Sequence, residues 1–287
     1  MFDKLNFKYP DEVAEAFIAG LNSKNISRHP DSFYKDVWSV DFGNGRRIMV
    51  KSGRRIGLGF PTSIETNPSH WPNLEEYIKD LSFLKTTALV IDRVDIAATL
   101  ETPYKLIYES MRVRFKRRGQ VHREYEEFNG EKTTGIYFGS GRDFIVAYDF
   151  GHRALNRRFK KTPGSEVGVW TRVERRLNHG KIPYTSLSQL KEYLSYPVFD
   201  SVEGYRVSEN TPPETYAVAR AKIQDLGMHR AFRNCFNKGS NFHKTWAKYI
   251  TPIPLADQLH ENYRSKLSSF LDEGPKVEKN REVYHVQ

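Results

Sequence analysis

The sequence predicts an α+β fold in which a mostly antiparallel central sheet carries flanking helices and is followed by a helical C-terminal region. Three observations predict it. Short segments that alternate apolar and polar residues recur up to about residue 180, and glycine turns join several of them. Apolar residues at helical spacing interleave with these segments, and after Thr185 the helical pattern is almost continuous. A boundary near residue 183 would therefore divide a domain of residues 1–183 from a region of residues 184–287.

The N-terminal elements follow from local pattern. Residues 11–22 place apolar side chains at helical spacing, which predicts a first helix. Residues 37–42 and 46–51 alternate in character, and the Gly-Asn-Gly turn between them predicts a hairpin. Residues 73–85 again show helical spacing and predict a second helix.

The same criteria assign the remaining elements in order. Strands are predicted over residues 86–100, 112–116, 121–128, 133–138, 143–150 and 167–177. Helices are predicted over residues 103–111, 152–161, 186–194, 213–236, 242–250 and 256–271. No internal repeat is visible in the sequence.

Charge and composition narrow the class of protein. The chain of 287 residues has 45 Lys and Arg against 35 Asp and Glu, a net charge of +10. This excess favours nucleic acid as the partner, ahead of an anionic membrane surface, because neutralised phosphates release condensed counterions. The single cysteine, Cys235, excludes an intramolecular disulfide and a cysteine-based zinc site. No apolar run has the length of a signal peptide or a membrane helix, so we expect a cytoplasmic protein and no membrane partner.

Two predicted strands each place an arginine and an acid on one face. Arg93 and Asp95 are two residues apart, as are Arg172 and Glu174, and side chains alternate along a strand. Tyr148 lies on a strand between these two in the sequence. If the three strands are neighbours in one sheet, a phenol, two carboxylates and two guanidinium groups converge on one patch.

This set of groups suits phosphodiester cleavage. Carboxylates bind Mg²⁺ or Mn²⁺, the cation neutralises the scissile phosphate, and the phenol attacks phosphorus to form a phosphotyrosyl ester. Each feature also has an ordinary explanation, since an Arg-x-acid pair is usually a surface ion pair and a strand tyrosine is usually half-buried packing. Their recurrence at suitable spacing in a basic chain favours the catalytic interpretation.

The order of these motifs resembles a known family. VIDRVDIAATL (residues 90–100), GIYFGSGRDFIVAYDF (135–150) and VWTRVERRL (169–177) are similar to the replication initiators of rolling-circle plasmids of the Rep_trans type. They are also similar to the gene II replication proteins of filamentous phages. Those families show an R-x-D strand, a Gly-Ser segment leading into a strand that ends in a tyrosine, and an R-x-E strand.

The resemblance implies a metal-dependent DNA-nicking endonuclease that starts rolling-circle replication of a plasmid or phage. It makes Tyr148 the nucleophile, Asp95 and Glu174 the acids of a Mg²⁺ or Mn²⁺ site, and Arg93 and Arg172 the groups that support the carboxylates or hold the phosphate. It also implies an origin or nick site in single-stranded or supercoiled DNA, a host helicase as partner, and a homodimer. Three further acids are candidate metal ligands: Asp92, Glu126 and Asp149.

Basic segments are expected to supply the DNA contacts. They lie before and after the tyrosine strand and would line a DNA groove, although a solvated basic face is the alternative for each. They comprise Arg112, Arg114, Lys116, Arg117 and Arg118 in the first segment, and Arg153 and Arg157 in the second. The C-terminal helices are expected to bind DNA or to mediate dimerisation.

Several alternatives to a replication initiator stay open. A relaxase, or a nickase of a mobile element that acts on another replicon, would share the same active site. A sequence-specific DNA-binding protein could keep the sheet without cutting. An RNA-binding protein could use aromatic strand residues as a stacking platform.

Overall fold

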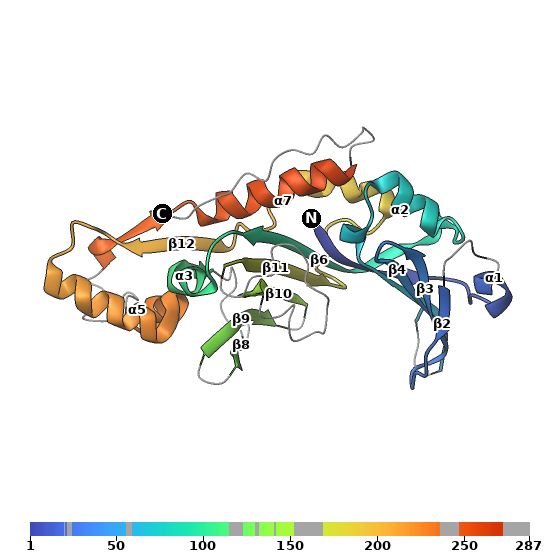
Figure 1. The fold of residues 1–287 in the computed structure, drawn as a ribbon, viewed down its shortest axis with the longest axis horizontal. Helices are drawn as coiled ribbons and strands as arrows, with labels where there is room; N and C mark the ends of the chain where they lie inside the picture. Colours follow the sequence, from blue (N-terminus) through green and yellow to red (C-terminus); the bar gives the residue numbers. More distant parts are fainter. Residues whose placement is uncertain are drawn as a thin grey trace.

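The computed structural model describes residues 1–19, 21, 25–55, 59–114, 123–129, 132–140, 142–151, 169–235 and 247–271. A ten-stranded antiparallel sheet forms the centre of the fold, and a separate three-stranded sheet lies beside it (Figure 1). This architecture confirms the predicted α+β class. No helix in the described part of the chain has the length and apolar character that a membrane span requires.

The elements have the following bounds. In spatial order the large sheet consists of β2 (Asn25–Arg28), β3 (Tyr34–Gly43), β4 (Arg46–Arg54), β5 (Thr62–Thr66), β1 (Phe2–Tyr9), β6 (Val90–Leu100), β11 (Thr171–Asn178), β10 (Asp143–Asp149), β9 (Lys132–Ser140) and β8 (Arg123–Asn129). The small sheet consists of β13 (Ile250–Ile253), β12 (Val202–Val207) and β7 (Met111–Val113). The helices are α1 (Glu15–Ala19), α2 (Leu74–Leu81), α3 (Tyr104–Ser110), α5 (Pro213–Asn234) and α7 (Leu255–Leu271), and the 3₁₀ helices are η1 (Pro68–His70), η2 (Thr86–Ala88), η3 (Leu187–Leu194) and η4 (Ala247–Tyr249).

The N-terminal strand β1 was not among the predicted elements. Phe2, Leu5 and Phe7 on this strand are fully buried, but charged residues between them obscure the alternation in the sequence. The hairpin of β3 and β4 was predicted correctly, and its turn residue Asn44 has the left-handed φ of 55° that such turns favour. The first helix is shorter than the predicted 11–22, because only the five residues of α1 are helical.

The expectation of an almost wholly helical region after Thr185 was wrong in part. Strands β12 and β13 belong to this region, and β12 pairs with both β13 and β7. The main core also crosses the expected boundary near residue 183, since the rings of Phe2 and Tyr193 meet edge to face with centroids 5.2 Å apart. The helix predicted over residues 152–161 and most of the one over residues 242–250 lie outside the described residues.

The large sheet is built from two halves with the same topology. The first half runs β1, α1, β2, β3, β4 and β5 along the chain, and the second runs β6, α3, β8, β9, β10 and β11. The spatial orders are β2-β3-β4-β5-β1 and β8-β9-β10-β11-β6, and β1 and β6 pair antiparallel at the centre. An approximate two-fold axis therefore passes between β1 and β6. The prediction that the chain has no internal repeat was wrong at the level of topology.

The sheet has an apolar and a polar face. Side chains of α2, α3, η3 and α7 complete the main core on the apolar face, and Figure 1 shows α2 and α7 on one side of the sheet. Alternate residues of the central strands, such as Lys4 on β1 and Glu174 on β11, point to the other face. The candidate site lies on this polar face.

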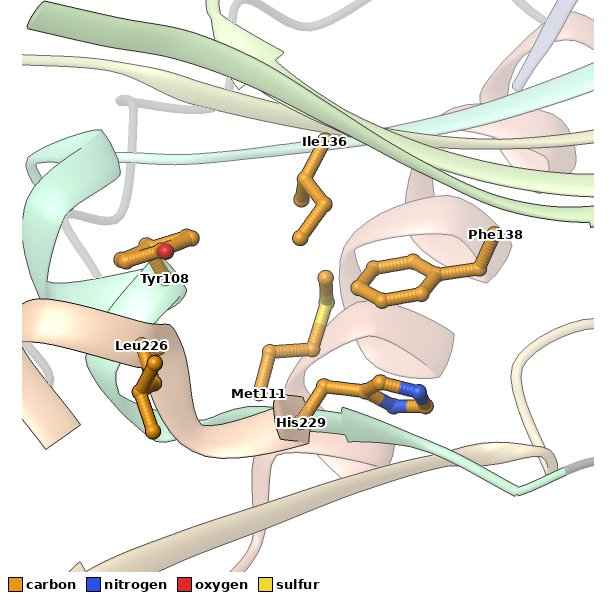
Figure 2. Close-up of a pocket in the computed structure, with 7 residues that line it drawn as sticks. Tyr108, Met111, Ile136, Phe138, Leu226 and His229 are labelled. Carbon is orange, nitrogen blue, oxygen red and sulfur yellow. The ribbon is translucent and has the colours of Figure 1, made fainter. Parts of the chain in front are cut away.

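Helix α5 bends at Gly227, where φ is 70° and ψ is 161°. Tyr108 of α3 packs against the bend so closely that a Cβ atom on Gly227 would lie 2.6 Å from the tyrosine ring. The side chains of this junction come from α3, β7, β9 and α5 (Figure 2). The Nδ1 atom of His229 accepts a hydrogen bond of 3.2 Å from the backbone N–H of Val113, which ties α5 to the small sheet.

Replacing Gly227 with alanine should destabilise the protein by about 3 kcal/mol, because the added Cβ meets both a left-handed backbone and the Tyr108 ring. Urea denaturation measures the loss. As the control, Ala217→Gly at an exposed position of α5 should cost no more than about 1 kcal/mol. A Gly227→Ala variant within about 0.5 kcal/mol of wild type would contradict the packing described.

Candidate active site

The three strands that carry the motifs are neighbours in the large sheet, in the order β6-β11-β10. Tyr148 on β10 pairs in register with Arg172 on β11, and Glu174 on β11 pairs with Ala97 on β6. The three strands are therefore adjacent, as the predicted convergence of Tyr148 with the acids and arginines required. The sheet brings the phenol, the acids and the arginines to one face.

Tyr148 points at Glu174. Its hydroxyl donates a hydrogen bond to the Glu174 carboxylate, and both side chains are buried, with 5% of Tyr148 and 3% of the Glu174 side chain exposed. Tyr137 and Val146 pack beside Tyr148 in a small apolar cluster that is separate from the main core. The phenol therefore sits in an apolar setting with a carboxylate as its acceptor.

Two guanidinium groups hold Glu174 from either side. The Nε atom of Arg172 lies 3.3 Å from Oε1, and Arg176 donates to Oε2 from Nε at 3.0 Å and from Nη2 at 2.6 Å. Arg172 also donates to Asp3 of β1 at 2.5 Å. Neither Asp3 nor Arg176 was among the predicted site residues.

Asp95 is paired in the same way. Arg93 donates to both of its carboxylate oxygens, at 2.8 and 2.7 Å, and the Nε atom of Arg176 lies 4.0 Å from Oδ2. Arg176 therefore stands between Asp95 and Glu174. We use the term ionic chain for the resulting series of three acids and three arginines, which runs Asp3, Arg172, Glu174, Arg176, Asp95 and Arg93.

The environment separates the proton affinities of the tyrosine and its acceptor. Burial raises the pKa of Tyr148 well above its ordinary value, and the charge of Glu174 raises it further. Burial alone would also raise the pKa of Glu174, but Arg176 and Arg172 hold it below the usual value. Burial raises the pKa of Asp3 despite its contact with Arg172. At neutral pH a neutral phenol thus donates to an ionised carboxylate.

As arranged, the described acids do not fit a divalent cation. All four carboxylate oxygens of Asp95 and Glu174 accept from a guanidinium or from the phenol. Within the described ranges, no three His, Cys, Asp or Glu side chains form a group that could hold a metal ion. A cation between Asp95 and Glu174 would need the position that Arg176 occupies.

The three additional ligand candidates lie away from this arrangement or outside the description. Asp92 is bound by Lys8 at 2.8 Å and approached by His179 at 3.5 Å. Asp149 follows Tyr148 on β10, so its side chain points to the opposite face of the sheet. The side chain of Glu126 lies outside the described residues.

The predicted DNA-binding arginines that the structure describes belong to the small sheet. Arg112 on β7 and Arg114 just beyond it both approach Glu203, at 3.4 and 3.3 Å, and the Arg112 guanidinium lies 4.4 Å above the Phe232 ring. These contacts place them on a different sheet from Tyr148. Five of the predicted basic residues lie outside the described part: Lys116, Arg117, Arg118, Arg153 and Arg157.

Two site residues, Arg176 and Asp3, were not predicted, and only one of them has a signal in the sequence pattern. Arg176 continues the two-residue alternation of Arg172 and Glu174, so the pattern of β11 alone could have indicated it. Asp3 lies on β1, which was not predicted as a strand, and it reaches Arg172 across β6. No local pattern reveals such a contact.

No protein-family model matches the chain, and a comparison with curated proteins finds no match. The resemblance to rolling-circle initiators therefore stays an expectation that rests on the order of the short motifs alone. The geometry of the polar face provides a separate basis for a functional proposal.

Replacing Arg176 with methionine should destabilise the protein by about 2–3 kcal/mol at pH 7, because the buried Glu174 carboxylate loses two charge-assisted hydrogen bonds. Folding lowers the pKa of Glu174 below the ordinary carboxyl pKa of 4.5. The ionised carboxylate therefore stabilises the folded state at every pH above 4.5, and this stabilisation is lost as the pH falls through the lowered pKa. The difference between wild type and variant should therefore shrink below about pH 4.5.

Guanidinium denaturation at pH 7 and at about pH 4 measures both effects. The matched control is Arg47→Met, since Arg47 is 62% exposed and lies 3.5 Å from Asp41. It should change stability by less than about 0.5 kcal/mol. Equal losses from Arg176→Met at both pH values would contradict the role assigned to Glu174.

Proposed function

We propose that this protein is a DNA-nicking endonuclease and strand transferase in which Tyr148 is the nucleophile. The observation that carries the proposal is the hydrogen bond from the Tyr148 hydroxyl to Glu174, a carboxylate held between two arginines. A phenol needs a base to become a nucleophile, and an ionised carboxylate within hydrogen-bond reach is such a base. The basic net charge of +10 supports a polyanionic substrate.

The proposed reaction is a transesterification. Glu174 takes the phenolic proton, the Tyr148 oxygen forms a bond to phosphorus, and the bond from phosphorus to one bridging oxygen breaks. That oxygen takes a proton from water and leaves as a free hydroxyl end of the DNA, and Glu174 returns the phenolic proton to solvent. The phosphotyrosyl ester keeps the energy of the broken bond, so attack by a DNA hydroxyl in the reverse direction joins strands.

The arginines supply positive charge where the reaction needs it. Arg172 lies beside both Tyr148 and Glu174, and its charge favours the ionised form of the phenol. As Glu174 becomes protonated, the guanidinium groups of Arg172 and Arg176 each lose one anionic partner, and their donors to Glu174 can bind the negative charge that develops on the phosphate.

The biological setting of this reaction is also proposed. Initiation of rolling-circle replication of a plasmid or phage follows from the motif order, with a host helicase and a homodimeric assembly as expected partners. A relaxase or a nickase of a mobile element would use the same site. Dependence on Mg²⁺ or Mn²⁺ is proposed from the order of the motifs alone. The geometry adds no support, because the carboxylates that would bind the ion are already paired with arginines.

Replacing Tyr148 with phenylalanine should lower the rate of nicking at least about 1,000-fold, because the nucleophile is removed while the ring is kept. Conversion of supercoiled to open-circular DNA measures the rate, and denaturing gels detect the covalent adduct. The matched control is Tyr137→Phe, a neighbour in the same apolar cluster, which should keep most of the activity. Full nicking by the Tyr148 variant would rule out the assignment.

The pH dependence of nicking should show a carboxylate base. Because the pKa of Tyr148 is raised and that of Glu174 is lowered, we expect a rate that is nearly flat from about pH 6 to 9. The rate should fall only at a pH lower than the ordinary carboxyl value of 4.5, because Arg176 and Arg172 lower the pKa of Glu174 and keep it ionised at that pH. A rate that rises about tenfold per pH unit above pH 7 would indicate attack by a pre-formed phenolate and would contradict this mechanism.

A second candidate function is a DNA-binding protein that does not cut. The burial of Tyr148 favours it, since only 5% of the side chain is exposed and a phosphate reaches the hydroxyl only if a neighbour moves. Specific DNA binding with no adduct, in the presence of Mg²⁺ or Mn²⁺ and across pooled single-stranded sequences, would support this alternative.

A further inference from the structure

The two halves of the large sheet correspond residue by residue through the registers of their strands. Matching TSIET of β5 to TRVER of β11 places Glu65 at the position of Glu174. The match preserves the apolar face, because Ile64 then corresponds to Val173, and both are fully buried in the main core. A two-fold axis perpendicular to the sheet keeps equivalent residues on one face.

A lysine takes the place of the tyrosine in the first half. On β10, Tyr148 lies two residues beyond the partner of Glu174, and on β4, Lys51 lies two residues beyond the partner of Glu65. The first half therefore keeps the acid but has an ammonium group where the second half has a phenol. Such a site can bind a phosphate but cannot form a phosphotyrosyl ester.

Two ammonium groups converge on the one carboxylate. The Nζ atom of Lys4 lies 2.8 Å from Oε2 of Glu65, and that of Lys51 lies 2.6 Å from Oε1. Burial alone would raise the pKa of Glu65, but the two lysines lower it, so the three groups together carry one net positive charge. We call them the lysine cluster.

The lysine cluster is open to a ligand. Between 22% and 33% of each side chain is exposed. Each ammonium group has three N–H donors and, among the described residues, uses one of them on Glu65. One lysine would be enough to neutralise the carboxylate, so the second provides a positive charge that no described acid balances.

The lysine cluster adjoins the ionic chain on the polar face. Lys4 on β1 lies directly opposite Asp95 on β6 in the antiparallel pairing. Strands β5 and β11 are three strand spacings apart, about 14 Å, and the registers offset Glu65 from Glu174 by about 13 Å along the strands, so these two residues lie about 19 Å apart. That is the length of about six nucleotides of a B-form strand at ~3.4 Å each. One DNA strand can therefore contact both sites.

We propose that the lysine cluster binds a backbone phosphate of the DNA strand whose scissile phosphate lies at Tyr148. The inference rests on the proposed nicking function and adds to it a second phosphate position a few nucleotides from the cut. The approximate two-fold repeat thus provides one site that cuts and one that only holds the strand.

The test is DNA binding by the full chain in a Tyr148→Phe background, so that no covalent adduct forms. The probe is a fluorescein-labelled single-stranded 20-mer of mixed sequence, and its anisotropy is followed at several salt concentrations. Lys51→Met and Lys4→Met should each weaken binding about five-fold at low salt. Each should also reduce the slope of log K against log salt by about 0.7, the value for one lost phosphate contact on a single strand.

Two controls separate binding from folding. Lys51→Arg should keep the affinity, and Lys191→Met, an exposed lysine of η3 that lies with the helices on the apolar side, should change neither affinity nor slope. Thermal unfolding of each variant reports stability. Unchanged affinity and slope in both methionine variants, with a lower melting temperature, would show that the lysine cluster only stabilises the sheet and would overturn the inference.

The wild-type protein is incubated with the same 20-mer and assayed for a phosphotyrosyl adduct. An adduct together with weaker binding by the methionine variants supports both proposals. If the variants lose affinity and no adduct forms on this or on pooled sequences, the nicking proposal fails while the lysine cluster stands as a phosphate site.

Discussion

The Glu174 carboxylate is ionised although only 3% of its side chain is exposed, because two guanidinium groups compensate its charge. An uncompensated buried carboxylate costs several kcal/mol, so the strands that supply its partners must align in one register. Arg176 comes from the same strand, Tyr148 from β10, and Asp3 reaches Arg172 from β1. The ionic chain and the hydrogen bond from Tyr148 thereby fix how β1, β6, β11 and β10 lie on the polar face.

The apolar face imposes a matching constraint from the other side of the sheet. Ile64 and Val173 occupy equivalent positions in the two halves, and α2, α3, η3 and α7 contribute side chains to the core in which both are buried. Because side chains alternate along a strand, placing these residues in the core forces Glu65 and Glu174 to the opposite face. Packing thus determines where the polar chemistry is found, and the repeat creates two related sites with different groups.

Much of the fold follows from local patterns. The hairpin of β3 and β4 and helix α7 have alternating or helical spacing over most of their length, and both were predicted. Strand β1 was not predicted because Asp3, Lys4 and Lys8 interrupt its apolar residues. The positions of these charged residues are explained only by their ion-pair partners on other strands. Strand β12 was not predicted because the strands it pairs with, β7 and β13, are distant in sequence.

The sequence by itself determined the α+β class, the basic charge, and which residues on β6, β10 and β11 share a face, because alternation is a property of each strand alone. Only the tertiary structure decided that these strands are neighbours, that Tyr148 donates to Glu174, and that Arg176 stands where a metal was expected. Contacts between strands depend on sheet order and register, and neither is encoded within a single strand. The two-fold repeat was hidden for the same reason, since strand order and pairing reveal it while most side chains differ between the two halves.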